Sequence, residues 1–307
     1  MASDLLKSIG KTPLIRLNNL PQSNSAEVWV KWEGANPTGS MKDRMALAMI
    51  EGAEKRGQLR PGDRVVEYTG GSTGSSLAMV CAAKGYRAHF VSSDAFAEEK
   101  LQTMKAFGAS LEMLPSREKK ITPDLIASIV ARARELSKEP NTFWTNQFEN
   151  PDNPAGYHSM AEEILDDCDN DVDAFVMSVG TGGCFSGNAK VLKDRLGGIK
   201  CVAVEPAASR NLSGGPLGGH RIEGIGSGFI PKNMRMDLVD EIVAVSDQDA
   251  YETARKLATV EGIFGGISSG ANVFAALKIA KNLGQGRRVV TVIVDSGLKY
   301  LQGNLFR

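Results

Sequence analysis

Several features that mark other classes of protein are scarce in this 307-residue chain. Its four cysteines form no C-x-x-C pair, and its three histidines are dispersed, so neither a disulfide framework nor a metal site is expected. The 36 basic residues balance the 36 acidic residues, which argues against a nucleic-acid or anionic-membrane surface. The strongest apolar run, residues 289–294, is too short to span a bilayer, and residues 1–8 lack the apolar core of a signal peptide. We therefore expect a cytoplasmic protein with reduced, mostly buried thiols.

Strand and helix patterns alternate along almost the whole chain, which is typical of parallel sheets covered by helices on both faces. The expected strands are residues 64–68, 88–91, 110–114, 174–179, 201–204 and 288–294. The expected helices are residues 75–84, 97–107, 123–136, 186–196, 247–261 and 271–283. We predict an α/β fold with two lobes, each a mostly parallel sheet flanked by helices. The large lobe would comprise residues 1–34 and 146–307, and a small, mobile lobe residues 35–145.

A lysine next to a turn rich in Pro and Gly is the strongest chemical signal. Lys42 follows residues 36–41 (Asn-Pro-Thr-Gly-Ser-Met) and precedes a helix-forming stretch. Ser40 is a suitable N-cap, which predicts that Lys42 lies in the first turn of a helix. Because the positive end of a helix dipole disfavours a cation, the Lys42 amine is pushed toward its neutral, nucleophilic form. Such an amine forms Schiff bases, above all with pyridoxal phosphate (PLP). A solvated surface lysine is the alternative.

A glycine-rich segment, residues 180–187, lies between an expected buried strand and an expected helix. Glycines let backbone N–H groups approach an anion closely, and the start of the next helix favours negative charge. A dinucleotide-binding motif would need a third glycine where Phe185 stands, although Glu205 superficially resembles the ribose-binding acid of that motif. The segment favours a single phosphate group, with a structural turn as the alternative.

Two further segments rich in Gly, Ser and Thr precede expected helices. Residues 67–74 carry hydroxyl and N–H groups that suit a carboxylate, although such segments are also common turns. Residues 265–270 include Ser268 and Ser269, either of which could cap the next helix. Segments 69–74 and 180–187 follow strands, where open α/β sheets bind ligands, and together they predict a cleft between lobes.

Taken in order, these motifs resemble the fold-type-II PLP enzymes, and within them the cysteine synthase (O-acetylserine sulfhydrylase) group. The resemblance covers almost the whole chain, and several motifs in family order are a more specific signal than any single glycine-rich loop. The segments that carry it are residues 9–14, 36–44, 146–151, 180–187, 220–226, 266–270 and 295–297.

The resemblance implies PLP as the cofactor and a role for each matching residue. Lys42 would form the Schiff base, Ser268 would hydrogen-bond the pyridine nitrogen, and Gly224 would lie in a segment that lines the cleft and helps it close. The residues that would bind the phosphate are Gly180, Thr181, Gly182, Gly183 and Cys184. The residues that would receive the substrate α-carboxylate are Thr69, Gly70, Ser72, Thr73 and Gln147.

The implied reaction is β-replacement on an O-activated serine, through an aminoacrylate intermediate, with sulfide or another small nucleophile. A neutral serine leaves the pyridine nitrogen unprotonated, which suits loss of a β-leaving group, and Lys42 would remove the α-proton. Closure of the carboxylate loop would shield the intermediate from water. A homodimer is expected, with an amino-acid substrate and a small nucleophile as its ligands and no nucleic-acid or membrane partner.

The chain departs from the family at the loop that should receive the substrate. That loop usually reads Thr-Ser-Gly-Asn-Thr-Gly, whereas here Gly70 and Ser72 replace the serine and the asparagine. Tyr68 is larger than the usual Ala or Pro, and Cys184 stands where the phosphate loop normally has Thr. We expect the altered loop either to admit a different substrate or nucleophile or to bind the carboxylate more weakly.

Two other functions remain open. The first keeps the fold and performs β-elimination without replacement, as in a serine/threonine dehydratase or a cysteine desulfhydrase, or serine racemisation. The second is a binding or regulatory protein that has lost activity through the altered loop. The retained Lys42 argues against the second function, because a pure binding protein has no need of it.

Overall fold

The computed structural model describes residues 4–118 and 122–307, apart from the side chain of Pro123. The chain divides into two compact units. The larger unit comprises residues 10–41 and 157–307, and the smaller unit comprises residues 4–9 and 42–156.

The larger unit is built on a six-stranded sheet in the order β1-β2-β10-β7-β8-β9. Only β1 runs antiparallel to its neighbour, and the other pairs are parallel. These strands are β1 (Leu14–Arg16), β2 (Glu27–Trp32), β7 (Ala174–Ser178), β8 (Lys200–Pro206), β9 (Glu241–Val245) and β10 (Arg288–Ile293). The interior strands are mostly apolar, because both faces of a parallel sheet are covered, although β8 carries the buried carboxyl of Glu205.

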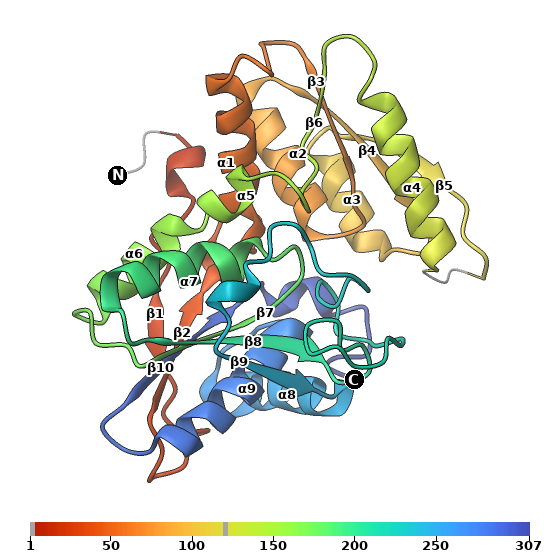
Figure 1. Ribbon diagram of the computed structural model, residues 1–307. Coiled ribbons are helices and arrows are strands. Elements are labelled where there is room, and N and C mark those ends of the chain that lie inside the picture. The colour runs from red at the N-terminus through yellow and green to blue at the C-terminus, as the bar shows by residue number, and fades with distance from the viewer. Residues whose placement is uncertain (1–3, 119–121) are drawn as a thin grey trace. The chain divides into compact units, whose positions relative to one another are not determined.

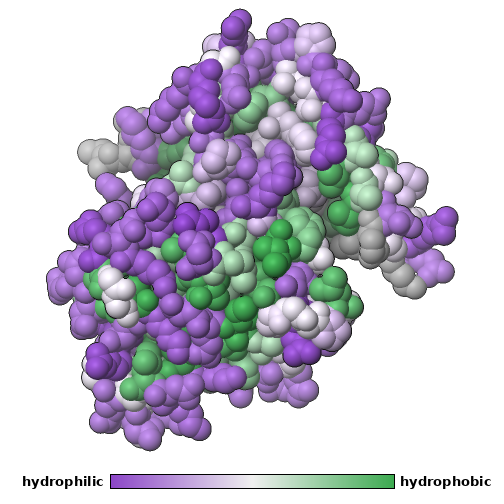
Figure 2. Space-filling view, viewed as in Figure 1, coloured by the Kyte–Doolittle hydropathy of each residue, from purple (hydrophilic) through white to green (hydrophobic). Residues whose placement is uncertain are grey.

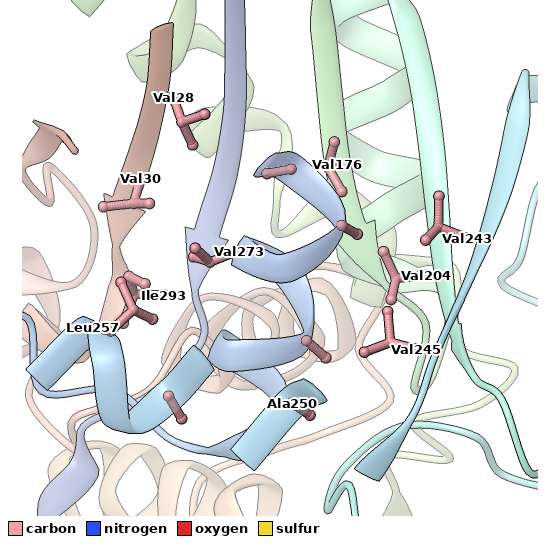
Figure 3. Close-up of a cluster of buried hydrophobic side chains, with 14 of the residues drawn as sticks. Val28, Val30, Val176, Val204, Val243, Val245, Ala250, Leu257, Val273 and Ile293 are labelled. Atoms are coloured by element: carbon pink, nitrogen blue, oxygen red, sulfur yellow. The ribbon is translucent and has the colours of Figure 1, made fainter. Parts of the chain in front are cut away.

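Helices cover both faces of this sheet (Figure 1). One face carries α6 (His158–Asp167) and α7 (Gly183–Leu196), and the other carries α8 (Asp247–Glu261) and α9 (Ile267–Leu283). Figure 3 shows the core under α8 and α9, where side chains from β2, β7, β8, β9 and β10 meet both helices. Val30, Val204 and Val273 there have no solvent exposure, so burial of their apolar surface stabilises this layer.

The smaller unit contains a four-stranded, all-parallel sheet in the order β5-β4-β3-β6. Its strands are β3 (Arg64–Tyr68), β4 (Arg87–Ser93), β5 (Ser110–Leu114) and β6 (Thr142–Trp144), and its helices are α1 (Lys42–Lys55), α2 (Ser72–Lys84), α3 (Glu98–Ala106), α4 (Pro123–Leu136) and α5 (Asp152–Ala155). Helices α2 and α3 lie on one face with α1 packed against α2, and α4 covers the opposite face (Figure 1).

The predicted α/β class, with two mostly parallel sheets flanked by helices, is confirmed. The bounds predicted for β3, β5, α4 and α8 match the structure. Strands β1, β2, β6 and β9 and helices α5 and α6 are absent from the elements expected from the sequence. β1 and β6 are three residues long, too short for a clear period-2 pattern.

Three helices begin earlier than predicted. α2, α7 and α9 start at Ser72, Gly183 and Ile267, whereas the sequence placed their starts at residues 75, 186 and 271. Glycine and serine are poor helix formers, so their segments were assigned to loops. In a first turn the N–H groups have no partner within the helix, and these residues therefore leave several N–H groups available to a ligand.

The surface shown in Figure 2 is mostly hydrophilic, with scattered apolar patches. The exposed large apolar side chains include Leu217, Phe229 and Ile230, which lie between β8 and β9.

All four cysteines are buried, and burial raises the pKa of the Cys81 and Cys201 thiols to about 12. None of the helices in the described part of the chain has the length and apolar character that a membrane span requires.

Candidate active site

Lys42 is the first residue of α1, so its predicted place in the first turn of a helix is confirmed. The residue before it, Met41, donates its N–H to the carbonyl oxygen of Val294 at 2.9 Å. The residue after it, Asp43, is fully buried, and its Oδ1 accepts the Ser76 hydroxyl of α2 at 2.6 Å. The backbone on either side of Lys42 is therefore fixed, which holds this lysine at the positive end of α1.

The segment from Gly180 to Gly183 joins β7 to α7 and leaves no space for side chains at two of its glycines. A Cβ on Gly180 would lie 2.3 Å from the carbonyl oxygen of Gly224. Gly182 has φ +80°, and a Cβ there would lie 2.8 Å from the backbone of Met234. Glycine is thus required at both positions, and the bare backbone leads directly into the positive end of α7. This cradle of backbone N–H groups fits a phosphate.

Cys184 is the second residue of α7 and is 5% exposed. The side-chain amide of Asn188 donates to the Cys184 carbonyl oxygen at 2.8 Å and lies 3.6 Å from its Sγ. Behind the loop, Asn272 of α9 accepts the Ser178 N–H at 2.8 Å and donates to the Val292 carbonyl oxygen at 2.9 Å. Buried amides therefore hold the start of α7 and the end of β7 in place.

Glu205, at the end of β8, uses its carboxylate for hydrogen bonds within the protein, whereas a ribose-binding acid needs its carboxylate for the ligand. Its carboxylate is 3% exposed and accepts the Leu212 N–H at 2.8 Å and the Ser213 hydroxyl at 2.5 Å. The carboxylate thus holds the chain that follows β8. Together with Phe185 in place of a third glycine, this arrangement favours the single-phosphate reading over a dinucleotide site.

Ser268 lies in the first turn of α9 and is 3% exposed. The N-cap of α9 is Gly266, and no side chain caps this helix, so the alternative that Ser268 or Ser269 is the N-cap is wrong. Ser269 instead accepts the Val294 N–H at 2.9 Å. A Cβ on Gly266 would lie 2.4 Å from Oδ1 of Asp295, which explains why a glycine is the N-cap of this helix.

The residues proposed to receive the carboxylate come together at the start of α2. Thr69 Oγ1 accepts the N–H groups of Gly71 at 3.3 Å and Gly74 at 3.2 Å. The Thr73 hydroxyl donates to Gln147 Oε1 at 2.8 Å, and Gln147 Nε2 donates to the Tyr68 carbonyl oxygen at 3.2 Å. Since Ser72 is the first residue of the helix, these polar groups surround its positive end, which suits an anion.

Tyr68 lies beneath this group rather than in open solvent. Its ring stacks on Phe148, with the ring centroids 5.9 Å apart and an interplanar angle of 9°. Burial, and then the neighbouring Glu67, raise the pKa of the Tyr68 phenol well above its usual value. The phenol therefore stays neutral at physiological pH.

Glu67, Phe96 and Asn272 are not among the site residues predicted from the sequence. Glu67 lies in β3 and Asn272 in α9, and both are fully buried among apolar residues. A polar residue that interrupts an apolar pattern in this way is the sequence signal that could have predicted their structural role. Phe96 carried no such signal.

No group of three or more His, Cys, Asp or Glu residues suited to a metal ion occurs in the described ranges.

Comparisons with known proteins identify the group to which this chain is related. The family model described as pyridoxal-phosphate dependent enzyme matches residues 5–295. The cysteine synthase of Staphylococcus aureus is 44% identical over 305 residues, which cover 99% of this chain and 96% of that protein. A hydrogen sulfide-producing enzyme from Fusobacterium nucleatum is 42% identical, with a TM-score of 0.92 and 98% of both chains covered. O-ureido-L-serine synthase is 36% identical, with a TM-score of 0.92, and the match covers 100% of this chain and 95% of that one. The chain therefore belongs to the pyridoxal-phosphate dependent enzymes, and within them to the cysteine synthase family.

Proposed function

We propose that this protein uses PLP to catalyse β-replacement on an O-activated serine. The observation that supports the proposal is that two helix starts in a chain of this family are built differently, and each suits a different anion. The start of α7 is a bare glycine cradle, which suits the cofactor phosphate. The start of α2 is surrounded by Thr69, Thr73 and Gln147, whose hydroxyl and amide groups suit a carboxylate.

Lys42 would form the covalent link to the cofactor. Residues 180–184 would bind the phosphate with backbone N–H groups, and the Ser268 hydroxyl would hydrogen-bond the pyridine nitrogen. When bound, PLP supplies the electron-withdrawing ring that lets an amino acid lose its β-substituent. Lys42, the first residue of α1, would also act as the base that removes the α-proton.

The substrate carboxylate is received by Thr69, Gly70, Ser72, Thr73 and Gln147 on the smaller unit. The hydrogen bond between Thr73 and Gln147 holds both side chains in place before a substrate arrives, which lowers the entropic cost of binding. The segment that contains Gly224 lies against Gly180 and closes over the bound ligand. Closure of the carboxylate loop would exclude water during the reaction.

We further propose that the protein is a cytoplasmic homodimer. Its ligands are an O-activated serine and a small nucleophile, with sulfide as the first candidate. Size-exclusion chromatography with light scattering tests the dimer, since a mass of one chain at working concentrations would contradict it.

The reaction is tested with the purified holoenzyme and a panel of O-acetylserine, O-phosphoserine, serine and cysteine. Each amino acid is supplied with and without sulfide, and the products are identified by mass spectrometry. We expect cysteine from an O-activated serine only when sulfide is present. Pyruvate and ammonia formed without a nucleophile would favour β-elimination, and an unchanged cofactor spectrum with every amino acid would favour a binding protein. Lys42→Ala is the control that should be inactive throughout.

A further inference from the structure

Gly70 and Phe96 compete for the same space in the smaller unit. They lie in the loops that follow the neighbouring parallel strands β3 and β4. A Cβ on Gly70 would lie 2.0 Å from Cγ of Phe96, and 2.1 and 2.3 Å from its two Cδ atoms. Carbon atoms in contact are about 3.5–4.0 Å apart, so no side chain fits at position 70 while Phe96 keeps its place.

The backbone at Phe96 is anchored within its own loop. Its N–H donates to the Ser93 carbonyl oxygen at 3.2 Å, and the Ala95 N–H donates to the Ser93 hydroxyl at 3.3 Å. The half-buried ring packs against the apolar cluster that includes Val66 and Val91. Cγ is the first ring atom, so the ring cannot clear a Cβ at position 70 by a small shift of its outer edge.

The carboxylate loop has its own anchors on the other side. Thr69 donates its N–H to the Val91 carbonyl oxygen at 3.1 Å, and its hydroxyl holds the N–H groups of Gly71 and Gly74. The loop is thus held against β4 at Thr69, and the Phe96 ring fills the gap beside Gly70. The glycine at position 70 therefore leaves no empty space beside the loop, because the Phe96 ring occupies the place of the missing side chain.

We propose that Phe96 is a positioning residue for the carboxylate loop, in a size-matched pair with Gly70. The ring supports the loop backbone where a side chain at position 70 would otherwise stand, and so sets how the loop receives the substrate α-carboxylate. This inference rests on the proposed function, because the substrate it concerns is the amino acid assigned to that loop. It also predicts that a serine at position 70 needs a smaller residue at position 96.

The test is a double-mutant cycle with Gly70→Ser, Phe96→Ala and the combined variant, measured on the holoenzyme. Spectral titration with O-acetylserine, O-phosphoserine and cysteine gives the affinity for the amino acid, and steady-state rates give kcat and KM. We expect each single variant to bind the amino acid about tenfold more weakly, with kcat at saturation changed less than about twofold. If the two effects were independent, the affinity of the combined variant for the amino acid would fall about a hundredfold. We instead expect the combined variant to bind the amino acid within about threefold of the natural protein, because the smaller residue at position 96 makes room for the serine.

Two further variants separate positioning from general damage. Gly71→Ser is the control for Gly70→Ser, because it introduces a serine at the next position, where a Cβ would meet nothing within 4 Å. This variant should keep the melting temperature of the natural protein. Phe96→Met replaces the ring by a flexible apolar chain and should bind the amino acid within about threefold of the natural protein. Unchanged amino-acid affinity in both Gly70→Ser and Phe96→Ala, or multiplied losses in the combined variant, would overturn the inference and leave the proposed function intact. If the cofactor spectrum of the natural protein responds to no amino acid, the proposed function is wrong, and so is the substrate role of the Gly70–Phe96 pair. The melting temperatures of the four proteins in the cycle would still show whether Gly70 and Phe96 are matched in size.

Discussion

The carboxylate of Glu67 holds the backbone of Gln147, whose N–H donates to Glu67 Oε2 at 3.0 Å. The same oxygen accepts the Thr145 hydroxyl at 2.6 Å, and Oε1 accepts the Tyr68 N–H at 2.8 Å and the Trp144 indole N–H at 3.3 Å. Burial raises the pKa of the Glu67 carboxyl, and these four donors oppose that rise. One buried side chain thus ties the end of β3 to the segment that carries Gln147.

Replacing Glu67 by glutamine should damage both stability and amino-acid binding. The new NH₂ group would face two donors in place of an acceptor, and such a buried mismatch costs about 1–3 kcal/mol. Because each carboxylate oxygen accepts a donor from the segment that leads to Gln147, either orientation of the new amide loosens that segment, and the affinity for the amino acid should also fall. Urea unfolding measures the stability, and spectral titration measures the affinity. Glu54→Gln is the matched control, since Glu54 accepts hydrogen bonds from Lys84 and Tyr86, away from the loop. Equal affinities in Glu67→Gln and Glu54→Gln would contradict this role.

Lys42→Ala should remain folded but lose covalent attachment of the cofactor and essentially all turnover. Truncation at the first residue of α1 should change the free energy of unfolding by less than about 1 kcal/mol. Borohydride reduction followed by peptide mass mapping should place the pyridoxyl label on Lys42 in the natural protein. Lys55→Ala, at the exposed far end of the same helix, should keep the label. A label on any other lysine would refute the assignment.

Gly180→Ala should weaken cofactor binding by tenfold or more, because a Cβ there would lie 2.3 Å from the Gly224 carbonyl oxygen and one of the two segments would have to move. A tenfold loss requires only about 1.4 kcal/mol. Equilibrium dialysis of the protein with PLP measures the change. Gly198→Ala, after the end of α7, faces open space and should bind the cofactor normally. Normal binding by Gly180→Ala as well would show that this glycine is not needed for the phosphate site.

Ser268→Asp should shift the absorption maximum of the bound cofactor and slow the reaction. An anionic partner favours the protonated pyridine nitrogen, whereas a serine hydroxyl does not. Ser269→Ala removes the acceptor of the Val294 N–H, so it should lower stability by about 1 kcal/mol without a spectral shift. If Ser268→Asp keeps the natural spectrum and rate, Ser268 does not contact the pyridine nitrogen.

Glu112 contributes to stability in a pH-dependent way that is separate from the site. Arg132 Nε donates to Glu112 Oε1 at 2.7 Å, and this ion pair holds the pKa of Glu112 below its usual value. A depressed folded pKa means that the unfolded chain binds the proton first as pH falls. The stabilisation is therefore complete above the unfolded pKa of about 4.3 and is lost as pH falls through the folded pKa.

Glu112→Gln should accordingly lower the free energy of unfolding by about 0.5–1 kcal/mol at pH 7, a modest amount because both side chains are about one-third exposed. Urea unfolding at pH 7, 5 and 4 should show the difference from the natural protein shrinking at the lowest pH. A difference that stays constant or grows on acidification would contradict the ion-pair explanation.

The sequence by itself determined the α/β class, the family and the ends of several elements. The predicted bounds of α8, Asp247 to Glu261, match the structure, and the signals at its ends are local: Ser246 caps it through the Asp249 N–H, and Gly262 follows its last residue. The order of motifs around Lys42 and residues 180–187 identified the family because such motifs are short and need no knowledge of distant contacts.

Only the tertiary structure decided what supports the carboxylate loop. Gly70 and Phe96 are brought together because β3 and β4 pair in parallel, so the loops after both strands leave the same edge of the sheet. Glu67 and Gln147 meet because β6 pairs with β3 on the other side. Sequence periodicity reports which residues share a face of one element, but it does not report which loops become neighbours, since that depends on the order of strands in the sheet. For this reason the sequence indicated an altered loop at Gly70, and the fold showed that Phe96 fills the space.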